Sequence, residues 1–308
     1  MIVVAGESLI DLLVAADGRV VAVLGGGPYN VARALGRLGR PVSFLGRLST
    51  DRFGSILRET LAAEGVDLSL APTTDDPTLL ALAELDAAGG ATYRFYAEGT
   101  AAPGLVATDL PAGLPPMTTA LHVGTLGLVF EPMAQTIEAL VAAATSDILV
   151  MADPNCRPTA IRDPAAYRAR LDRILARVDV VKVSVDDLAW LDPGAEPLDA
   201  ARRILDRGPA AILVTDGAGP VRLLTDRGVT ELTVPAVRVV DTVGAGDTFG
   251  AGFLAAWTGA GRGRSALSDD AALTAATRFA IEVGARTTTR AGAEPPTLAE
   301  LEGVAGLW

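Results

Sequence analysis

The residues best suited to chemistry gather in one short stretch, Asp241–Asp247, whose sequence is Asp-Thr-Val-Gly-Ala-Gly-Asp. An apolar run over Leu232–Val240 predicts a strand that leads into this stretch, and large apolar residues recur at helical spacing after it. The small residues Gly244, Ala245 and Gly246 therefore lie where a loop turns into a helix N-terminus. Free backbone N–H groups and the positive end of the helix dipole hold anions at such a place, and glycine lets a phosphate approach closely.

Asp247 falls at the start of the predicted helix, where a carboxylate either caps the helix or points at a bound ligand. An anion cradle beside a carboxylate base is what phosphoryl transfer to a hydroxyl requires. The alternative is an ordinary capped helix behind a glycine-rich loop, because a short glycine motif is weak evidence by itself.

Several nucleotide-binding sites are excluded by residues that the sequence lacks. Lys182 is the only lysine, so the chain contains neither a Walker A loop nor the ATP site of a protein kinase. After Gly244 and Gly246 the next glycine is Gly250, one residue too late for the dinucleotide-binding pattern G-x-G-x-x-G.

His122 is the only histidine and Cys156 the only cysteine, which excludes H-E-x-x-H sites, C-x-x-C zinc sites and disulfides within the chain. His122 lies in an apolar strand-like run, Ala120–Gly124, where a hydrogen-bonded core histidine is favoured over a member of a Ser-His-Asp triad. A general base in this chain is therefore expected to be a carboxylate.

The length, net charge and composition of the chain limit the kinds of protein it can be. The 308 residues suffice for a large core, and we expect one domain over residues 1–308. A net charge of −11 argues against nucleic acid as a partner. No uncharged apolar run reaches the ~18 residues of a membrane span, and Met1–Ala5 is typical of a buried strand rather than a signal segment. A single cysteine without a targeting segment predicts a cytoplasmic protein with no membrane partner.

Strand-like and helix-like segments alternate along most of the chain, which predicts an α/β fold with a doubly wound, mostly parallel sheet. The expected strands are Ile2–Ala5, Val42–Leu45, Leu121–Val123, Ile148–Ala152, Val178–Val183 and Ile212–Val214. The expected helices are Asn30–Gly39, Ser55–Gly65, Ala134–Ala144, Ala166–Arg177 and Leu198–Arg207.

Two segments, at about residues 9–23 and 78–100, interrupt this alternation. Each is rich in strand-forming residues, with turns expected at Asp17-Gly18 and Gly89-Gly90. We expect them to form a small β-sheet inserted in the domain and placed as a lid over the site. The alternative is a pair of edge hairpins without such a role.

Four further stretches bring together polar residues and glycines, several of them at strand ends, where open α/β sheets bind ligands. They are Gly6–Asp11, Gly25–Asn30, Asp153–Arg157 and Thr215–Gly219. Carboxylate, glycine backbone and amide side chain together suit the hydroxyls of a sugar.

Together these stretches resemble the PfkB (ribokinase-like) carbohydrate kinases, from Gly6 to about Pro296. The chain carries D-T-x-G-A-G-D at Asp241–Asp247, G-G-x-x-x-N at Gly25–Asn30 and D-x-N-x-R at Asp153–Arg157. The resemblance implies a ribokinase-like fold and ATP-dependent phosphorylation of a sugar hydroxyl with Mg²⁺. It also implies K⁺ beside the anion hole, as in many members, and a homodimer formed through the lid sheet.

The resemblance also implies roles for individual residues. Asp247 looks like the general base, and Gly244, Ala245 and Gly246 look like the anion hole for the transferring phosphoryl group. The implied sugar-binding residues are Asp11, Gly25, Gly26, Asn30 and Arg157, the last touching substrate or phosphate. The implied nucleotide-binding residues are Thr215, Gly217, Ser184 and Gly246. The implied ion ligands are Asp241 and Val243 for K⁺ and Asp187 for Mg²⁺.

One departure concerns the family's N-x-x-E motif, which appears here as Ser184–Asp187. Asp187 keeps the charge of the glutamate but is one methylene shorter.

The segment Phe95–Ala102 bears on the substrate, since it is similar to the F-Y-R-x-G-T-A-D of fructokinase-like members. Kinases of 2-keto-3-deoxygluconate place an arginine after the aromatic pair, where this chain has Ala97 and Glu98, and a glutamate would repel a sugar acid. Tyr96 either stacks on the sugar or only packs in the lid. We therefore expect a neutral ketohexose, fructose first, with 2-keto-3-deoxygluconate, ribose and nucleosides as alternatives.

Two other function classes compete with a sugar kinase. A non-catalytic sugar or nucleotide sensor is disfavoured because Asp247 and the anion-hole residues are all present. A dehydrogenase on the same kind of sheet is opposed by the missing G-x-G-x-x-G and by the lack of a histidine acid–base group.

Overall fold

The computed structural model describes residues 1–15, 17–85, 91–111 and 113–301. Within these residues the largest feature is an eight-stranded sheet. In spatial order its strands are β14 (Gly228–Leu232), β13 (Val221–Thr225), β12 (Ala211–Thr215), β11 (Val180–Ser184), β10 (Leu149–Asp153), β9 (Ala120–Gly124), β1 (Ile2–Ala5) and β4 (Val42–Leu45). Every pair from β12 to β4 is parallel, whereas β13 and β14 add an antiparallel edge.

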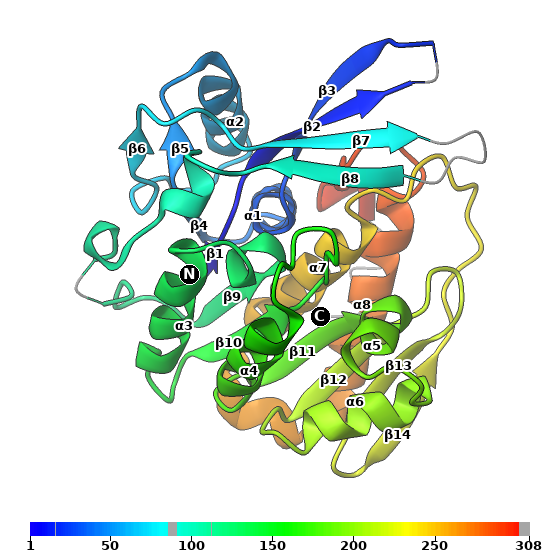
Figure 1. The fold of residues 1–308 in the computed structure, drawn as a ribbon. Coiled ribbons are helices and arrows are strands. Elements are labelled where there is room, and N and C mark those ends of the chain that lie inside the picture. Colours follow the sequence, from blue (N-terminus) through cyan, green and yellow to red (C-terminus); the bar gives the residue numbers. More distant parts are fainter. Residues whose placement is uncertain (16, 86–90, 112, 302–308) are drawn as a thin grey trace.

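Helices cover both faces of this sheet (Figure 1). One face carries α1 (Gly27–Arg37), α2 (Arg52–Ala63), α7 (Ala245–Gly259) and α8 (Asp270–Thr287), which share one buried apolar cluster with the sheet. The other face carries α3 (Met133–Ala143), α4 (Pro164–Leu175), α5 (Val185–Leu191) and α6 (Pro197–Leu205), which share a second cluster. Because both faces are covered, the parallel strands are apolar along most of their length, as the sequence indicates.

A second sheet lies across one end of the first, at the top of Figure 1. Its strands, in spatial order, are β3 (Val20–Gly25), β2 (Leu9–Val14), β7 (Leu80–Leu85) and β8 (Ala91–Tyr96). A short pair, β5 (Leu48–Ser49) and β6 (Thr73–Thr74), lies outside both sheets. The two segments that interrupt the βαβ pattern therefore do form one small sheet, as predicted.

The chain reverses its direction of travel across the main sheet at β1. After β1 it passes to β4 on one side, and it then returns to β9 on the other side. The carboxyl ends of β1 and β9 thus enclose a topological switch point, the place where doubly wound sheets bind ligands.

The predicted doubly wound fold is confirmed, and, apart from the strand expected over Leu232–Val240, each expected strand and helix is present within three residues of its predicted bounds at either end. The helix expected from Asn30 begins three residues earlier, at Gly27, because Gly26 serves as its N-cap and Pro28 fits its first turn. The turn expected at Gly89-Gly90 lies outside the described residues. No helix among the described residues is long and apolar enough to cross a membrane.

The strand expected over Leu232–Val240 is wrong. Only Leu232 belongs to a strand, the last residue of β14, and the chain then leaves the sheet. Pro235 cannot donate a backbone hydrogen bond, and Val239 and Val240 are exposed. The segment crosses instead to the end of α8, where Val240 N donates to Thr288 O at 2.8 Å.

Candidate active site

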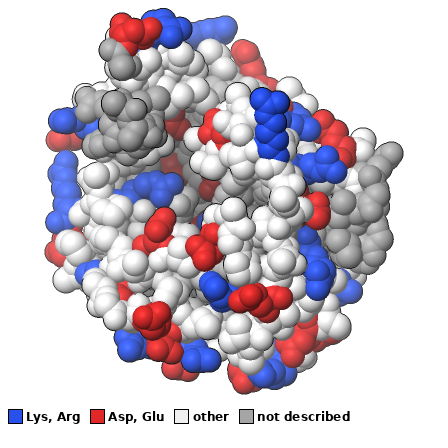
Figure 2. All heavy atoms as spheres, turned by 90° about the vertical axis from the view of Figure 1, so that its right-hand side faces the viewer, with Lys and Arg blue, Asp and Glu red and all other residues white. Residues whose placement is uncertain are grey.

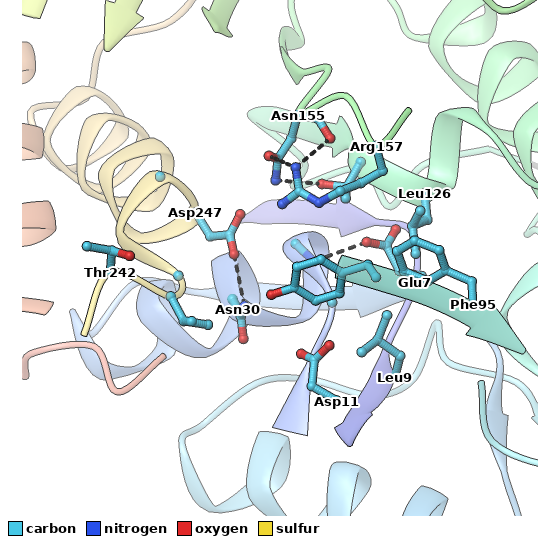
Figure 3. Close-up of a pocket in the computed structure, with 17 residues that line it drawn as sticks. Glu7, Leu9, Asp11, Asn30, Phe95, Leu126, Asn155, Arg157, Thr242 and Asp247 are labelled. Carbon is cyan, nitrogen blue, oxygen red and sulfur yellow. Dashed lines mark hydrogen bonds between the residues drawn. The ribbon is translucent and has the colours of Figure 1, made fainter. Parts of the chain in front are cut away.

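A cavity of about 310 Å³ lies at the switch point. Its walls come from the segment after β1, the small sheet, α1, the loops after β9 and β10, and the first turn of α7. Figure 2 shows that this side of the molecule is hollowed, with acidic side chains inside the depression. Figure 3 shows how the side chains converge on the cavity.

Asp247 lies in the first turn of α7 and is only 8% exposed. Its carboxylate makes no capping bond to the helix; Oδ2 instead accepts a hydrogen bond from Asn30 Nδ2 at 2.9 Å, across from α1 (Figure 3). The carboxylate therefore lines the cavity and does not serve as a cap of α7. Burial raises the pKa of Asp247, and the Asn30 hydrogen bond, Lys182 and Arg157 partly offset this.

The loop before α7 has the backbone geometry of an anion site. Gly244 is the N-cap, with φ of 74°, a left-handed conformation that glycine adopts without strain. Gly244 and Gly246 line the cavity, whereas Ala245 does not, and Ala245 N donates to Thr242 O at 3.2 Å. The first turn of a helix leaves N–H groups without partners inside the helix, so this end of α7 can hold a negative charge.

Asp11 lies across the cavity from Asp247 (Figure 3). Burial raises the pKa of Asp11 to about 6, with Asp247 adding to the shift and Arg157 opposing it. Gly25 packs directly behind Asp11, since a Cβ at Gly25 would stand 2.2 Å from Asp11 Oδ2. Gly26, with φ of 109°, opens α1 beside the cavity.

Glu7 is a site residue that the sequence analysis did not single out. It is fully buried and lines the cavity, and its two oxygens accept from Gly27 N at 3.0 Å and Gly127 N at 2.9 Å. The carboxylate thus ties the start of α1 to the turn after β9. Burial raises the pKa of Glu7 to about 7 despite these hydrogen bonds. A charged residue one glycine beyond an apolar strand was the available signal.

The aromatic wall of the cavity comes from β8, but from different residues than predicted. Tyr93 and Phe95 line the cavity, with ring centroids 6.3 Å apart. Tyr96 is 53% exposed and does not line it. Successive side chains of a strand point to opposite faces, so Tyr96 cannot share the face of its neighbour Phe95.

Two residues of the cavity wall hold strained backbone conformations. Thr125, with φ of 49°, directly follows β9, and Asn155, with φ of 38°, lies two residues beyond the end of β10. Asn155 Nδ2 donates to Thr125 Oγ1 at 3.3 Å. Arg157 closes the same corner, because its Nη1 donates to Asn155 Oδ1 at 2.7 Å. This network fixes the guanidinium at the cavity wall.

The predicted ion-binding residues lie in two separate places, Asp241 and Val243 in the loop before α7 and Asp187 in the first turn of α5. Asp241 accepts from Val243 N at 3.0 Å and from Gly292 N at 2.8 Å, so its carboxylate holds the loop in shape. Asp187 accepts from Cys156 N at 2.6 Å and forms a capping box with Ser184 at the start of α5. In the described part of the chain no group of three or more His, Cys, Asp or Glu side chains could hold a metal ion.

The predicted nucleotide-binding residues lie further along the same edge of the main sheet. Ser184 and Thr215 are the last residues of β11 and β12 and are register partners, and Gly217 follows with φ of 53°. None of these three lines the cavity.

A second missed feature is the ion pair between Lys182 on β11 and Asp153 on β10, both 3% exposed, with Nζ 2.9 Å from Oδ2.

His122 also lies in the interior, as predicted, but the expectation of a hydrogen-bonded histidine is wrong. Neither ring nitrogen has a hydrogen-bond partner among the described residues. Burial, with Lys182 adding to it, lowers the pKa of His122 to about 3, so the ring is neutral.

A ribokinase-like sheet with a buried carboxylate at a helix N-terminus defines a class, the kinases that phosphorylate a small-molecule hydroxyl. Residues 1–300 match the pfkB family carbohydrate kinase, and the chain belongs to this family. It is therefore a sugar kinase.

Three known proteins illustrate the similarity. The chain is 40% identical over 262 residues to a fructokinase of Rhizobium leguminosarum bv. trifolii, covering 83% of this chain and 79% of the relative. The fructokinase from Xylella fastidiosa with bound ATP superposes with a TM-score of 0.87 at 28% identity, over 99% of this chain and 98% of that one. Fructokinase from Vibrio cholerae O395, bound to fructose, ADP and calcium, gives 0.87 at 27% identity over 98% of both chains. A double mutant of it, bound to fructose, ADP and potassium, gives 0.87 at 26%, over 98% and 97%.

Proposed function

We propose that this protein transfers the γ-phosphoryl group of ATP to a hydroxyl of fructose. One observation carries the assignment of roles: the Asp247 carboxylate, held by Asn30, lies at the start of α7 and faces a cavity whose opposite wall bears Asp11. Fructokinases among the relatives and structural neighbours support fructose as the sugar.

In the proposed reaction the sugar hydroxyl attacks the γ-phosphorus of ATP. The new O–P bond forms as the bond to the oxygen bridging the β- and γ-phosphates breaks, and ADP leaves. The hydroxyl proton passes to Asp247, whose raised pKa brings it nearer to neutrality and makes it a better proton acceptor than an exposed aspartate. The backbone at Gly244, Ala245 and Gly246 stabilises the charge on the transferring phosphoryl group, provided that Ala245 N exchanges its bond to Thr242 O for the phosphoryl oxygen.

The charges of the cavity support a neutral sugar over a sugar acid. Glu7, Asp11 and Asp247 line it against one guanidinium, that of Arg157. A substrate carboxylate would meet an excess of negative charge in a partly desolvated site. We propose that Asp11, Asn30 and Arg157 hold the sugar hydroxyls, with the backbone of Gly26 and the rings of Tyr93 and Phe95 beside them. Gly25 does not line the cavity and would act from behind Asp11. Tyr93 and Phe95 thus replace Tyr96 as the aromatic residues proposed to contact the sugar.

For the nucleotide we propose Ser184, Thr215, Gly217 and Gly246, which follow the edge of the sheet toward the anion hole. The donors fit a magnesium ion that arrives with ATP, since Mg²⁺ is commonly held by substrate phosphates and one or two carboxylates. Asp187 is the proposed carboxylate, and the ion would neutralise phosphate charge. Asp241 and Val243 fit a K⁺ site, because the carboxylate is already fixed by two backbone N–H groups.

We propose that the chain acts as one domain, with the small sheet as its lid and as the interface of a homodimer. Val20 and Val21 on β3 and Tyr96 on β8 are large hydrophobic residues that are more than half exposed on the two edge strands of this sheet. Cys156 is unpaired and buried, which suits a reducing cytoplasm.

The test is ADP release by the purified protein with Mg-ATP and a panel of fructose, tagatose, ribose, 2-keto-3-deoxygluconate, adenosine and fructose phosphates. We expect saturable turnover with fructose and little with the sugar acid. Preference for another sugar would replace fructose while keeping the kinase, and silence across the panel in a folded, ATP-binding protein would overturn the function.

A further inference from the structure

Lys182 is placed where a charge is costly. It lies on the central strand β11, 3% exposed, and it is the only lysine among 308 residues. A buried ammonium persists only when it is paired, and here Asp153 Oδ2 stands 2.9 Å from Nζ. Replacing such a pair by apolar residues is often neutral or stabilising, so stability alone does not account for it.

The ammonium lies directly beneath the proposed anion hole. A Cβ at Gly246 would come within 2.7 Å of Lys182 Nζ. One turn further along α7, a Cβ at Gly250 would stand 3.6 Å from Met151 Cε and 3.9 Å from His122 Nε2. Glycines four residues apart thus let the start of α7 pack closely on β9, β10 and β11, with Nζ against the backbone of Gly246.

Asp247 is surrounded by charges from several elements: Glu7 after β1, Asp11 on β2, Asp153 on β10, Arg157 after β10 and Lys182 on β11. Three of these five are carboxylates, which oppose the ionisation of Asp247. Of the two cations, Arg157 lies at the cavity wall, within reach of a substrate. Lys182 is sealed beneath the helix and acts on Asp247 whatever the cavity holds.

We propose that Lys182 is a positioning residue for phosphoryl transfer: fixed by Asp153, it keeps Asp247 ionised and adds positive charge beneath the anion hole. This inference rests on the proposed function. It also gives a second reason for a glycine at position 246. A side chain there would collide with Lys182 on the side of the sheet, as well as obstruct a phosphate on the side of the cavity.

The test uses two variants that break the same ion pair in opposite ways. Lys182→Met keeps the length of the side chain and removes the cation, whereas Asp153→Asn keeps the cation and removes its counter-ion. With an electrostatic role, the acid limb of the kcat/KM profile moves up by about one pH unit in Lys182→Met and down in Asp153→Asn. At a pH below the limb this is a roughly tenfold loss in the first variant. The proposal would be overturned if the acid limb stayed in place in both variants. It would also be overturned if the limb moved in the same direction in both variants and the melting temperature fell in both.

A second readout does not depend on turnover. The ¹³Cγ resonance of Asp247, assigned by its absence in Asp247→Asn, reports the titration of this carboxyl in wild type and both variants. Opposite displacements of its midpoint support the proposal and equal ones contradict it. If Lys182→Met does not fold, the direction in Asp153→Asn alone decides. Absent turnover in wild type would instead count against the proposed function, so the two failures are distinguishable.

Discussion

The start of α7 and the small sheet face each other across one cavity, yet they are built in opposite ways. Asp247 is buried at the end of a helix whose next ten residues are buried too, and it sits among other carboxylates. The small sheet turns Tyr93 and Phe95 toward the cavity while Val21 and Tyr96 remain exposed. Under the proposed function the difference amounts to a division of labour: the buried carboxylate of α7 and the charges beneath it carry the chemistry, and the small sheet contributes substrate contact and the homodimer interface.

The strongest test of this division is Asp247→Asn. Removal of a general base costs 10²–10⁴ in rate, so we expect kcat to fall by about 10³-fold while the KM for fructose changes little. Because the folded state raises the pKa of Asp247, the ionised form is disfavoured there, and the neutral asparagine should not lower the melting temperature. Steady-state kinetics and a thermal melt measure both.

A matched control exists for this variant. Asp199 occupies the same third position of its helix, α6, but its side chain is 56% exposed. Asp199→Asn should leave kcat unchanged. Near wild-type turnover in Asp247→Asn, or an equal loss in both variants, would contradict the assignment of the base.

Glu7→Gln tests the rigid side of the comparison with a smaller expected effect. A glutamine has one acceptor oxygen for the two N–H groups of Gly27 and Gly127, so the start of α1 should loosen and kcat fall by about tenfold. The variant also removes an ionisable group, because the glutamine amide does not titrate as the Glu7 carboxyl does. Folding raises the pKa of Glu7 from 4.5 to about 7, so proton binding by Glu7 stabilises the folded state. This contribution to the free energy of unfolding is fully present below pH 4.5 and is lost as the pH rises through about 7.

The measurement is the free energy of urea unfolding for wild type and Glu7→Gln at several pH values from 4 to 8. The difference, wild type minus variant, should fall with rising pH, by on the order of 3 kcal/mol in all. A difference that is flat over this range would show that Glu7 does not titrate as its burial suggests.

Much of the fold could be predicted because it follows from local patterns. Short apolar runs separated by amphipathic segments determine a covered parallel sheet, and glycines at Gly26 and Gly244 mark helix starts. The strand predicted over Leu232–Val240 fails because apolar β-branched residues also occur in extended segments that pair with no strand. Pro235 was the contrary signal.

Residues of the candidate site could be predicted where they belong to a sequence motif, and not where only the tertiary fold brings them to the cavity. Asp247, Asn30 and Asp11 converge although more than 200 residues separate the first two. Glu7 and Lys182 carry no motif, and their importance arises from strands that the sheet places side by side. Only the anomaly of a charge in an apolar run could have indicated them.

The last prediction concerns the two faces of β8 and has the smallest effect on turnover. Tyr93→Ala removes a ring from the cavity wall, and loss of one aromatic contact, about 0.5–1.5 kcal/mol, should raise the KM for fructose up to about tenfold with kcat nearly unchanged. Tyr96→Ala is the matched variant three residues along the same strand. It should leave the KM unchanged and instead weaken the proposed homodimer, measured by light scattering over a range of protein concentrations. The reverse result, a raised KM in Tyr96→Ala and none in Tyr93→Ala, would mean that the small sheet turns its other face to the sugar. A tenfold loss of kcat in either variant would contradict the division of labour itself, because the small sheet would then contribute to the chemical step.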